Sequence, residues 1–346
     1  MELLPLPLTF SLIILISISL WPIGKCIECG GMEIAHEITV DQQDQGAFTT
    51  VQAAIDSLQS NYDKWVKIHI NAGTYVEKVE IPKDKPCVIL EGDSSISTII
   101  TYDDHGATNS SATFASSAPN VIVSGITFQN TFHLKQYLKI HNISAKQKNQ
   151  VKQAVAAKIG GDNYYFLNCT FRGWQDTLFD QVGRHYFKGC TIEGQIDFIF
   201  GYAQSFFEDC VINATKGESE FAGFVTANGR NASTDKGGFV FLRGSVVGDC
   251  PVNLGRAWGS YSTTIFHGTY FHSLVTPQGW DAWYYKGNED TLTYAECGCT
   301  GPGANNPNRV SWMKELNDED IQTYDRSSFI DQDGWLSNLP KIYQPV

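Results

Sequence analysis

The chain has 346 residues and a mass of 38.4 kDa, with 42% hydrophobic and 18% charged residues, a composition that excludes a largely disordered protein. Its formal net charge is −12, and its pI is near 5.1. These values exclude a protein that binds nucleic acid without sequence preference, because such binding needs a basic face that displaces counterions.

Residues 1–25 predict a secretory signal peptide, and we expect a single domain at 36–346. An apolar run with early prolines ends before Gly24, and its core at 8–20 is shorter than a membrane span. A retained membrane anchor is the alternative, because Glu2 precedes the run and no basic residue does. We therefore expect a secreted, extracellular protein that has no membrane segment after cleavage.

Short strands and one amphipathic helix are predicted over residues 38–130. A strand is expected at 38–40. The segment GAFTTVQAAIDSLQS, which begins at Gly46, has apolar residues at helical spacing and a threonine available as N-cap. We expect this helix to cover the N-terminal end of the fold. Alternating apolar residues then predict strands separated by turns, and we interpret Glu77 among them as a structural carboxylate rather than a functional one.

Residues 131–152 interrupt the strand pattern. They are polar, carry five lysines and show no β periodicity. A loop of this length in a compact domain suggests a function. We expect a mobile excursion beside the site, whose positive charge attracts an anionic substrate, and a merely solvated loop is the alternative. The lysines are Lys135, Lys139, Lys146, Lys148 and Lys152.

Residues 153–201 carry a regular repeat. Gln153 and Gln175 are 22 residues apart, and Asp176 and Asp197 are 21 residues apart. The phrases YFLNCTF, YFKGCTI and FFEDCVI keep nearly the same interval. Such a repeat, rich in aromatic and β-branched residues, indicates an all-β solenoid of stacked coils. Stacking would bring equivalent residues to about 4.7–4.9 Å from one another, one strand spacing.

Cysteines and glycosylation sequons agree with export. Among the nine cysteines, Cys190 and Cys210 lie one coil apart and are candidates for a disulfide. We expect Asn168 to lie inside a strand, where its sequon would be sterically blocked. The five sequons begin at Asn109, Asn142, Asn168, Asn213 and Asn231.

After residue 212 the pattern predicts further coils and then an acidic, partly helical tail packed on the outside of the solenoid. His267 and His272 alternate with aromatic residues as strand positions do, so no metal site is predicted there. No Gly-x-Ser-x-Gly elbow, phosphate loop or His-Glu-x-x-His motif is present. The usual support for a serine hydrolase, a nucleotide enzyme or a zinc protease is therefore missing.

Asp176 and Asp197 carry the predicted chemistry. Two carboxylates one coil apart cannot ionise independently, so one should keep its proton while the other stays anionic. An arginine such as Arg256 would keep Asp197 ionised as a nucleophile, which leaves Asp176 as the general acid. The amides of Gln153 and Gln175 could stabilise an oxyanion. Trp258, close to Arg256 in sequence, offers a flat face for a sugar ring.

The motifs QAVA, GxQDTL, DFIFG and LGRxW occur here in that order, and with them nearly all of the mature chain resembles the plant pectinesterases, or pectin methylesterases. The resemblance is to the type without an inhibitor-like pro-domain. It implies a right-handed parallel β-helix and hydrolysis of the C6 methyl esters of homogalacturonan, without metal or organic cofactor. It also implies a cell-wall protein whose partners are pectin and a proteinaceous pectinesterase inhibitor, and we expect a monomer.

The resemblance also implies a role for each motif residue. Asp197 would attack the C6 ester carbonyl, and Asp176 would protonate the departing methanol and later act as base toward water. The implied catalytic residues are Gln153, Gln175, Asp176 and Asp197, and the implied substrate-binding residues are Gln153, Arg256 and Trp258.

Three departures from the family pattern concern the groove rather than the chemistry. The link between Thr131 and Gln153 is longer than usual, Lys152 stands where a histidine is common, and Ala257 stands where a proline is common. The rival interpretations are a pectin lyase or polygalacturonase on the same fold, and a non-catalytic β-helix that binds the cell wall.

Overall fold

The computed structural model describes residues 29–132, 152–216, 221–304 and 307–345. The predicted signal peptide, the sequon at Asn142 and nearly all of the lysine-rich segment 131–152 lie outside the described residues. Among the residues that are described, no helix combines the length and the apolar character needed to cross a bilayer.

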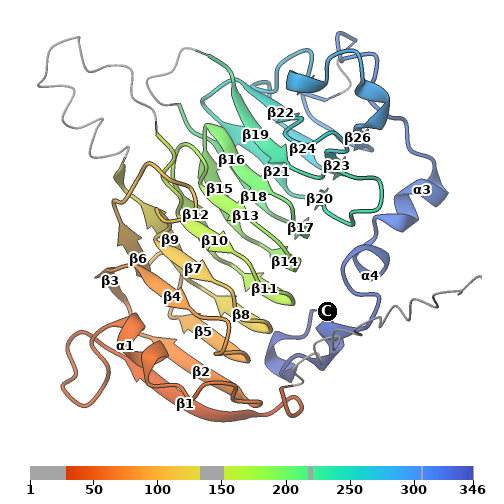
Figure 1. Ribbon diagram of the computed structural model, residues 1–346. Coiled ribbons are helices and arrows are strands. Elements are labelled where there is room, and N and C mark those ends of the chain that lie inside the picture. The colour runs from red at the N-terminus through yellow and green to blue at the C-terminus, as the bar shows by residue number, and fades with distance from the viewer. Residues whose placement is uncertain (1–28, 133–151, 217–220, 305–306, 346) are drawn as a thin grey trace, which may run out of the picture.

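Parallel strands wind into three sheets, which we call sheets A, B and C (Figure 1). Sheet A contains β1 (Ile34–Val40), β2 (Trp65–Ile70), β5 (Val88–Gly92), β8 (Val121–Ser124), β11 (Tyr164–Leu167), β14 (Arg184–Lys188), β17 (Gln204–Glu208), β20 (Gly238–Leu242), β23 (Thr263–His267) and β26 (Thr293–Cys297).

Sheet B contains β3 (Gly73–Val76), β6 (Thr98–Tyr102), β9 (Thr127–Asn130), β12 (Thr170–Arg172), β15 (Thr191–Gly194), β18 (Val211–Ala214), β21 (Ser245–Gly248) and β24 (Tyr270–Phe271). Sheet C contains β4 (Val79–Ile81), β7 (Phe114–Ser116), β10 (Ala157–Ile159), β13 (Leu178–Asp180), β16 (Ile196–Gly201), β19 (Gly223–Asn228), β22 (Val252–Arg256) and β25 (Trp280–Asp281).

The strand order shows that consecutive coils stack directly on one another. In each sheet the next strand along the stack usually comes three strands later in the chain, so one coil contributes one strand to each sheet. All pairings between neighbouring strands are parallel, and crossovers between parallel strands are right-handed. The predicted right-handed parallel β-helix is therefore confirmed.

Phenylalanine rings stack along the interior. Phe166, Phe187, Phe207, Phe241 and Phe266 occupy one register position of sheet A, and successive ring centroids are 4.9, 4.5, 4.5 and 4.4 Å apart. These distances are close to the spacing between strands, so the backbone ladder and the ring ladder have the same repeat. The aromatic residues of the sequence repeat thus hold adjacent coils in register.

Most turns from sheet A to sheet B pass through one left-handed residue. Gly125, Asn168, Gly189 and Asp209 have φ values of 65, 53, 62 and 54°. Glycine adopts this conformation without strain, and asparagine and aspartate tolerate it better than other residues. Asn168 is exposed in such a turn between β11 and β12, so the prediction that it lies inside a strand is wrong.

The predicted capping helix is present as α1 (Val51–Asp56). The Thr50 side chain accepts a hydrogen bond from Ala53 N, and one face of the helix is buried in the main core. The Glu77 carboxylate accepts hydrogen bonds from Val51 N at 2.9 Å and from Gln52 N at 3.0 Å. These contacts satisfy free amides at the helix N-terminus and confirm the structural interpretation of Glu77.

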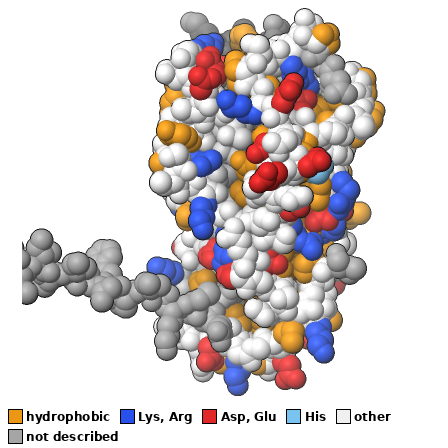
Figure 2. All heavy atoms as spheres, turned by 90° about the vertical axis from the view of Figure 1, so that its right-hand side faces the viewer, with side chains coloured by type: hydrophobic (Ala, Val, Ile, Leu, Met, Phe, Trp, Pro, Cys, Tyr) orange, Lys and Arg blue, Asp and Glu red, His pale blue; other side chains and the backbone are white. Residues whose placement is uncertain are grey.

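The C-terminal segment returns along the outer face of sheet A, on the right in Figure 1, as predicted. It contains α3 (Asp318–Thr323), α4 (Arg326–Phe329), η4 (Trp335–Asn338) and η5 (Lys341–Tyr343), after η2 (Trp283–Tyr285) and η3 (Glu289–Thr291). Tyr186 donates a hydrogen bond of 2.6 Å to Glu208, which also pairs with Arg326 at 3.4 Å. Acidic and basic side chains lie interspersed on this face (Figure 2).

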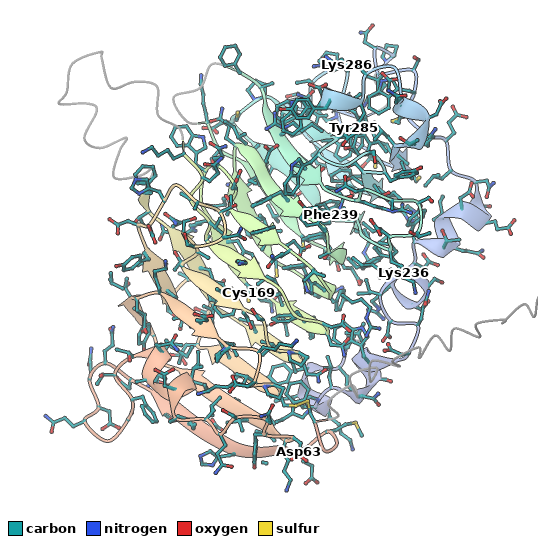
Figure 3. All side chains as sticks on the ribbon, viewed as in Figure 1. Asp63, Cys169, Lys236, Phe239, Tyr285 and Lys286 are labelled. Atoms are coloured by element: carbon teal, nitrogen blue, oxygen red, sulfur yellow. A yellow bond between two sulfur atoms is a disulfide. The ribbon has the colours of Figure 1, made fainter. Side chains whose placement is uncertain are left out.

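The disulfide pattern differs from the prediction. Cys29 and Cys87 form a disulfide, whereas Cys190 and Cys210 are separate buried thiols, so the predicted Cys190–Cys210 bridge is wrong. Each thiol instead donates a hydrogen bond to a backbone carbonyl of the preceding coil, Phe166 O or Phe187 O. Cys169 occupies the equivalent position one coil earlier and is marked in Figure 3 within the stack.

The Cys29–Cys87 disulfide ties the segment before β1 to the start of β5, over 58 residues. Closing a loop of this length in the unfolded chain is expected to stabilise the fold by about 2–4 kcal/mol. Cys29→Ser should therefore lower the free energy of unfolding by about that amount in urea titrations. Cys297→Ser, at a partly buried free thiol, is the control, and an unchanged midpoint in Cys29→Ser would contradict the assignment.

Candidate active site

A hollow of about 280 Å³ lies against sheet C. All six residues singled out from the sequence contribute to its wall. A larger hollow of about 410 Å³ lies beside α1, but no carboxylate lines it, so it lacks the chemistry of the smaller one. The lining of the hollow on sheet C consists of Thr108, Gln153, Gln175, Asp176, Asp197, Phe200, Ala227, Arg256, Trp258 and Trp283.

Backbone pairing brings these residues from distant parts of the chain onto adjacent coils. Ala154 N donates to Gln175 O at 3.3 Å, and Asp176 N donates to Ile196 O at 3.0 Å. Gln153, Gln175 with Asp176, and Asp197 therefore follow one another along the stack. This arrangement arises because the sequence interval between them equals one coil.

Both aspartates adopt an uncommon backbone conformation. The φ angles of Asp176 and Asp197 are 61 and 47°, in the left-handed region. The pairing of β16 with β19 also shifts register between Ile196 and Ile199, so Asp197 lies in a β-bulge. Bulges and left-handed non-glycine residues redirect side chains and are often found at functional sites. Here they accompany the two carboxylates that line the hollow.

Arg256 binds the Asp197 carboxylate through two hydrogen bonds. Its Nε donates to Oδ1 at 2.7 Å, and its Nη2 donates to Oδ2. The guanidinium contacts two rings, 4.5 Å from the centroid of Phe224 and 3.8 Å from that of Trp283. Such a planar, two-point contact fixes the orientation of the carboxylate, and the rings hold the arginine in place.

The two carboxylates have different electrostatic surroundings. Asp176 and Asp197 are only 7% and 8% exposed. Burial raises the pKa of both, and the Arg256 pair opposes that rise for Asp197. No described side chain pairs with Asp176 in this way, and burial and the charge of Asp197 raise its pKa to about 8. The Arg256 pair favours the ionised form of Asp197, so Asp176 is the member of the pair that holds a proton more readily.

Neutral donors and aromatic rings complete the hollow. Gln153 and Gln175 are partly buried and supply side-chain amides. Phe200 stacks on Phe179 with centroids 4.5 Å apart, and Trp258 packs against Phe200 at 5.9 Å. The hollow thus combines two carboxyl groups in unequal surroundings, amide donors and an apolar floor. That set suits acyl transfer on a ligand that has apolar ring faces.

Sequence reasoning missed several residues around the site. Phe200 could have been found from the alternation in DFIFG, because Ile199 points into the core and its neighbour must face outward. Trp283 gave no such signal, because it approaches Arg256 from a later coil.

Trp174 and Gln195 are two further residues near the site that the sequence did not indicate. Trp174 Nε1 donates to the Gln195 side-chain oxygen, which links the turn before Asp176 to the turn before Asp197. Gln195 is fully buried, and its backbone oxygen accepts a hydrogen bond of 2.9 Å from Phe224 N. This chain of contacts connects both acidic turns to the ring that covers Arg256.

Comparison with known proteins identifies the family. Residues 37–333 match the family model described as Pectinesterase. The chain belongs to the pectinesterase family. It is 45% identical over 311 residues to putative pectinesterase 10 of Arabidopsis thaliana, with 89% of each chain covered. It is 43% identical over 307 residues to probable pectinesterase 29 of the same plant, covering 88% of this chain and 90% of the relative.

Solved pectinesterase structures share the fold. The pectin methylesterase from carrot superposes with a TM-score of 0.79 at 30% identity, covering 90% of this chain and 97% of that one. The pectin methylesterase from Aspergillus niger superposes with a TM-score of 0.74 at 23% identity, covering 91% and 100%. The resemblance to the pectinesterase family that the four motifs indicated is therefore confirmed.

The raised pKa of Asp176 has a consequence for stability. A carboxyl whose pKa is higher in the folded than in the unfolded protein makes folding progressively less favourable between those two pKa values, here from about pH 4 to about pH 8. Asp176→Asn removes this cost. The variant should melt at a higher temperature than the parent, by a margin that widens from pH 5 to pH 8.

Thermal unfolding at a series of pH values measures this margin. Asp63→Asn is the control, because Asp63 is exposed and makes no ion pair with any described residue. A margin that is constant across the pH range would contradict the proton assignment.

Proposed function

We propose that this protein is a pectinesterase that hydrolyses the C6 methyl esters of homogalacturonan and releases methanol and demethylated pectin. The observation that carries the proposal is the pair of buried carboxylates on adjacent coils, of which only Asp197 is held by an arginine. Such a pair supplies a nucleophile and a general acid at the same pH. Membership of the pectinesterase family supports the choice of ester.

In the first half of the reaction, the ionised Asp197 attacks the ester carbonyl carbon. The carbonyl oxygen becomes an oxyanion, which accepts hydrogen bonds from the amides of Gln153 and Gln175. As the intermediate collapses, the bond to the methoxy group breaks and Asp176 donates its proton to the leaving oxygen. Methanol departs, and an acyl anhydride links Asp197 to the sugar.

In the second half, water replaces methanol. The ionised Asp176 removes a proton from the water as its oxygen attacks the acyl carbon. The same amides stabilise the second oxyanion, and its collapse regenerates the Asp197 anion and releases the galacturonic acid group, which then loses its proton to solvent. Asp176 ends with a proton and is ready for the next ester, so no other acid or base is needed.

The residues that line the hollow bind the substrate. Trp258 presents its ring beside Phe200, which suits stacking against the apolar face of a sugar. Arg256 fixes the direction from which Asp197 approaches the ester, and Gln153 contributes to substrate contact as well as to the oxyanion. Contacts that form mainly in the transition state raise kcat, and they change the affinity for the unreacted ester little.

The protein acts outside the cell on cell-wall pectin, as a monomer, after removal of residues 1–25. The apolar N-terminal run and the Cys29–Cys87 disulfide support export, because disulfides persist in oxidising compartments. A proteinaceous pectinesterase inhibitor is the expected protein partner. The described sequons at Asn109, Asn168 and Asn231 are exposed and are the expected glycosylation sites.

Removing the nucleophile tests the mechanism. Asp197→Ala should reduce methanol release from highly esterified pectin by about 10³-fold or more, while affinity for pectin changes little. Because Arg256 loses its partner, thermal unfolding must show that the variant is folded, and the isosteric Asp197→Asn provides a second measurement. Turnover near the parent level in a folded variant would refute the nucleophile.

The assay also separates the rival enzymes. A pectinesterase releases methanol without new reducing ends and without unsaturated products. A polygalacturonase creates reducing ends, and a lyase creates unsaturated products. Either product in place of methanol would refute the proposed function.

The two carboxyl groups should set the pH profile. The value of kcat/KM should fall above about pH 8, where Asp176 loses the proton it must donate. It should also fall at acid pH, where Asp197 becomes protonated, and this limb should lie above the ordinary pKa of an aspartate because burial raises the pKa of Asp197. In Asp176→Asn the alkaline limb should disappear from the residual activity. An unchanged alkaline limb would remove Asp176 from the mechanism.

A further inference from the structure

Trp174 and Gln195 occupy equivalent positions in successive coils. Trp174 comes shortly before Asp176, and Gln195 stands in the same place before Asp197. Their backbones are paired, because Gln195 N donates to Trp174 O at 2.8 Å and Ile196 N donates to the same oxygen at 3.2 Å. Their side chains are joined by the hydrogen bond from Trp174 Nε1 to Gln195 Oε1. The two acidic turns are therefore connected through both backbone and side chains.

Both acidic turns need support from their surroundings. Asp176 and Asp197 have φ angles of 61 and 47°, in the left-handed region. A residue other than glycine keeps this conformation only where neighbouring contacts hold it there. The side-chain contact between Trp174 and Gln195 lies just before both of these residues in the chain. It is therefore placed to hold both turns in the same conformation.

Gln195 also connects these turns to β19. It is fully buried, and its Nε2 donates to Phe221 O at 3.4 Å. Its backbone oxygen accepts a hydrogen bond of 2.9 Å from Phe224 N, and the Phe224 ring contacts the Arg256 guanidinium. A Cβ atom on Gly223 would lie 2.1 Å from Gln195 O, so this close approach requires a glycine. One buried residue thus contacts three parts of the site.

Neither Trp174 nor Gln195 lines the hollow. Gln195 has no exposed surface, and Trp174 is partly buried. Any effect of this pair on the reaction must therefore act through the residues that it holds in place. Such an effect can be large, because a displacement of about 1 Å in a reacting group can lower a rate about 10²-fold.

We propose that Trp174 and Gln195 are positioning residues, whose hydrogen bond fixes the Asp176 and Asp197 carboxyl groups in the arrangement that ester hydrolysis requires. The inference rests on the proposed function, because it concerns the geometry of the same two acids. The contact adds nothing to substrate binding itself. Its loss should therefore lower kcat and leave KM nearly unchanged.

The proton affinity of Asp176 reports on this arrangement. Burial raises the pKa of Asp176 and the charge of Asp197 raises it further, whereas the charge of Arg256 lowers it. Releasing the two turns from each other admits water and weakens the influence of Asp197. Both changes lower the pKa of Asp176. The alkaline limb of kcat/KM should then move to lower pH.

Four substitutions separate positioning from general stability. Trp174→Phe removes the indole donor but keeps a ring, and Gln195→Met removes the amide but keeps a side chain of similar length. The first control, Trp65→Phe, removes a buried indole whose nitrogen has no hydrogen-bond partner among the described residues. The second control, Gln204→Met, removes an amide that donates to Phe329 O in the C-terminal segment.

Methanol release from highly esterified homogalacturonan is measured across a pH series. In Trp174→Phe and in Gln195→Met, kcat should fall about tenfold to hundredfold, with a change in KM of less than about twofold. The alkaline limb should move to lower pH by about 0.5–1 unit. The double variant should lose no more than the weaker single variant, because both substitutions remove the same contact. Both controls should keep the kcat and the alkaline limb of the parent.

Parent values of kcat and of the alkaline limb in folded Trp174→Phe would overturn the proposal. So would losses that multiply in the double variant, or an equal loss in Gln204→Met, which would indicate general destabilisation. Thermal unfolding must show that each variant is folded. If the buried substitution Gln195→Met prevents folding, Trp174→Phe decides the question, because Trp174 is only partly buried.

Failure of the proposed function would look different, because the parent protein itself would then release no methanol. Thermal unfolding still tests the contact in that case. The stabilisation that Asp176→Asn gives at pH 8 should be smaller in a Trp174→Phe background than in the parent, because a lower pKa of Asp176 makes its burial less costly. Equal stabilisation in the two backgrounds would overturn the inference.

Discussion

Parallel stacking at a single strand spacing is the constraint on which this protein depends. The ladder of phenylalanine rings and the backbone ladder of sheet A repeat at nearly the same distance, so each coil can lie only in register with its neighbours. The register in turn determines which side chains line the site, because a slip of one residue would turn the side chains of a strand to the opposite face. The two carboxylates lie on adjacent coils because the core holds the coils in this register.

Stacking alone would give two similar carboxylates, and the difference between them comes from a later coil. Arg256 reaches Asp197 from β22, and Trp283 covers the arginine from the coil after that. Asp176 receives no comparable partner from the described residues, so burial raises its pKa and the charge of Arg256 opposes the rise only in part. Five consecutive coils therefore contribute to one pair of acids with unequal proton affinity, which is the property that ester hydrolysis needs.

The charge along sheet C also differs from that of the protein as a whole. The protein is acidic, as is the polymer left by the proposed reaction, so general electrostatics oppose the product. Lys158 on the apolar floor forms no ion pair with a described carboxylate, so its charge opposes this repulsion locally. Coulomb attraction at such a short range outweighs distant repulsion, which salt screens over about 10 Å.

The sequence by itself determined the solenoid, its capping helix, the family and the meeting of Gln153, Gln175, Asp176 and Asp197, because a repeat interval equal to one coil fixes which residues are stacked. Only the tertiary structure decided the Cys29–Cys87 disulfide, the exposed turn at Asn168 and the rings around Arg256. These features depend on contacts between coils joined by turns of unequal length and on side-chain directions at bulges. A periodic pattern specifies neighbours along the stack, but it carries no information about which way a side chain points where the period breaks.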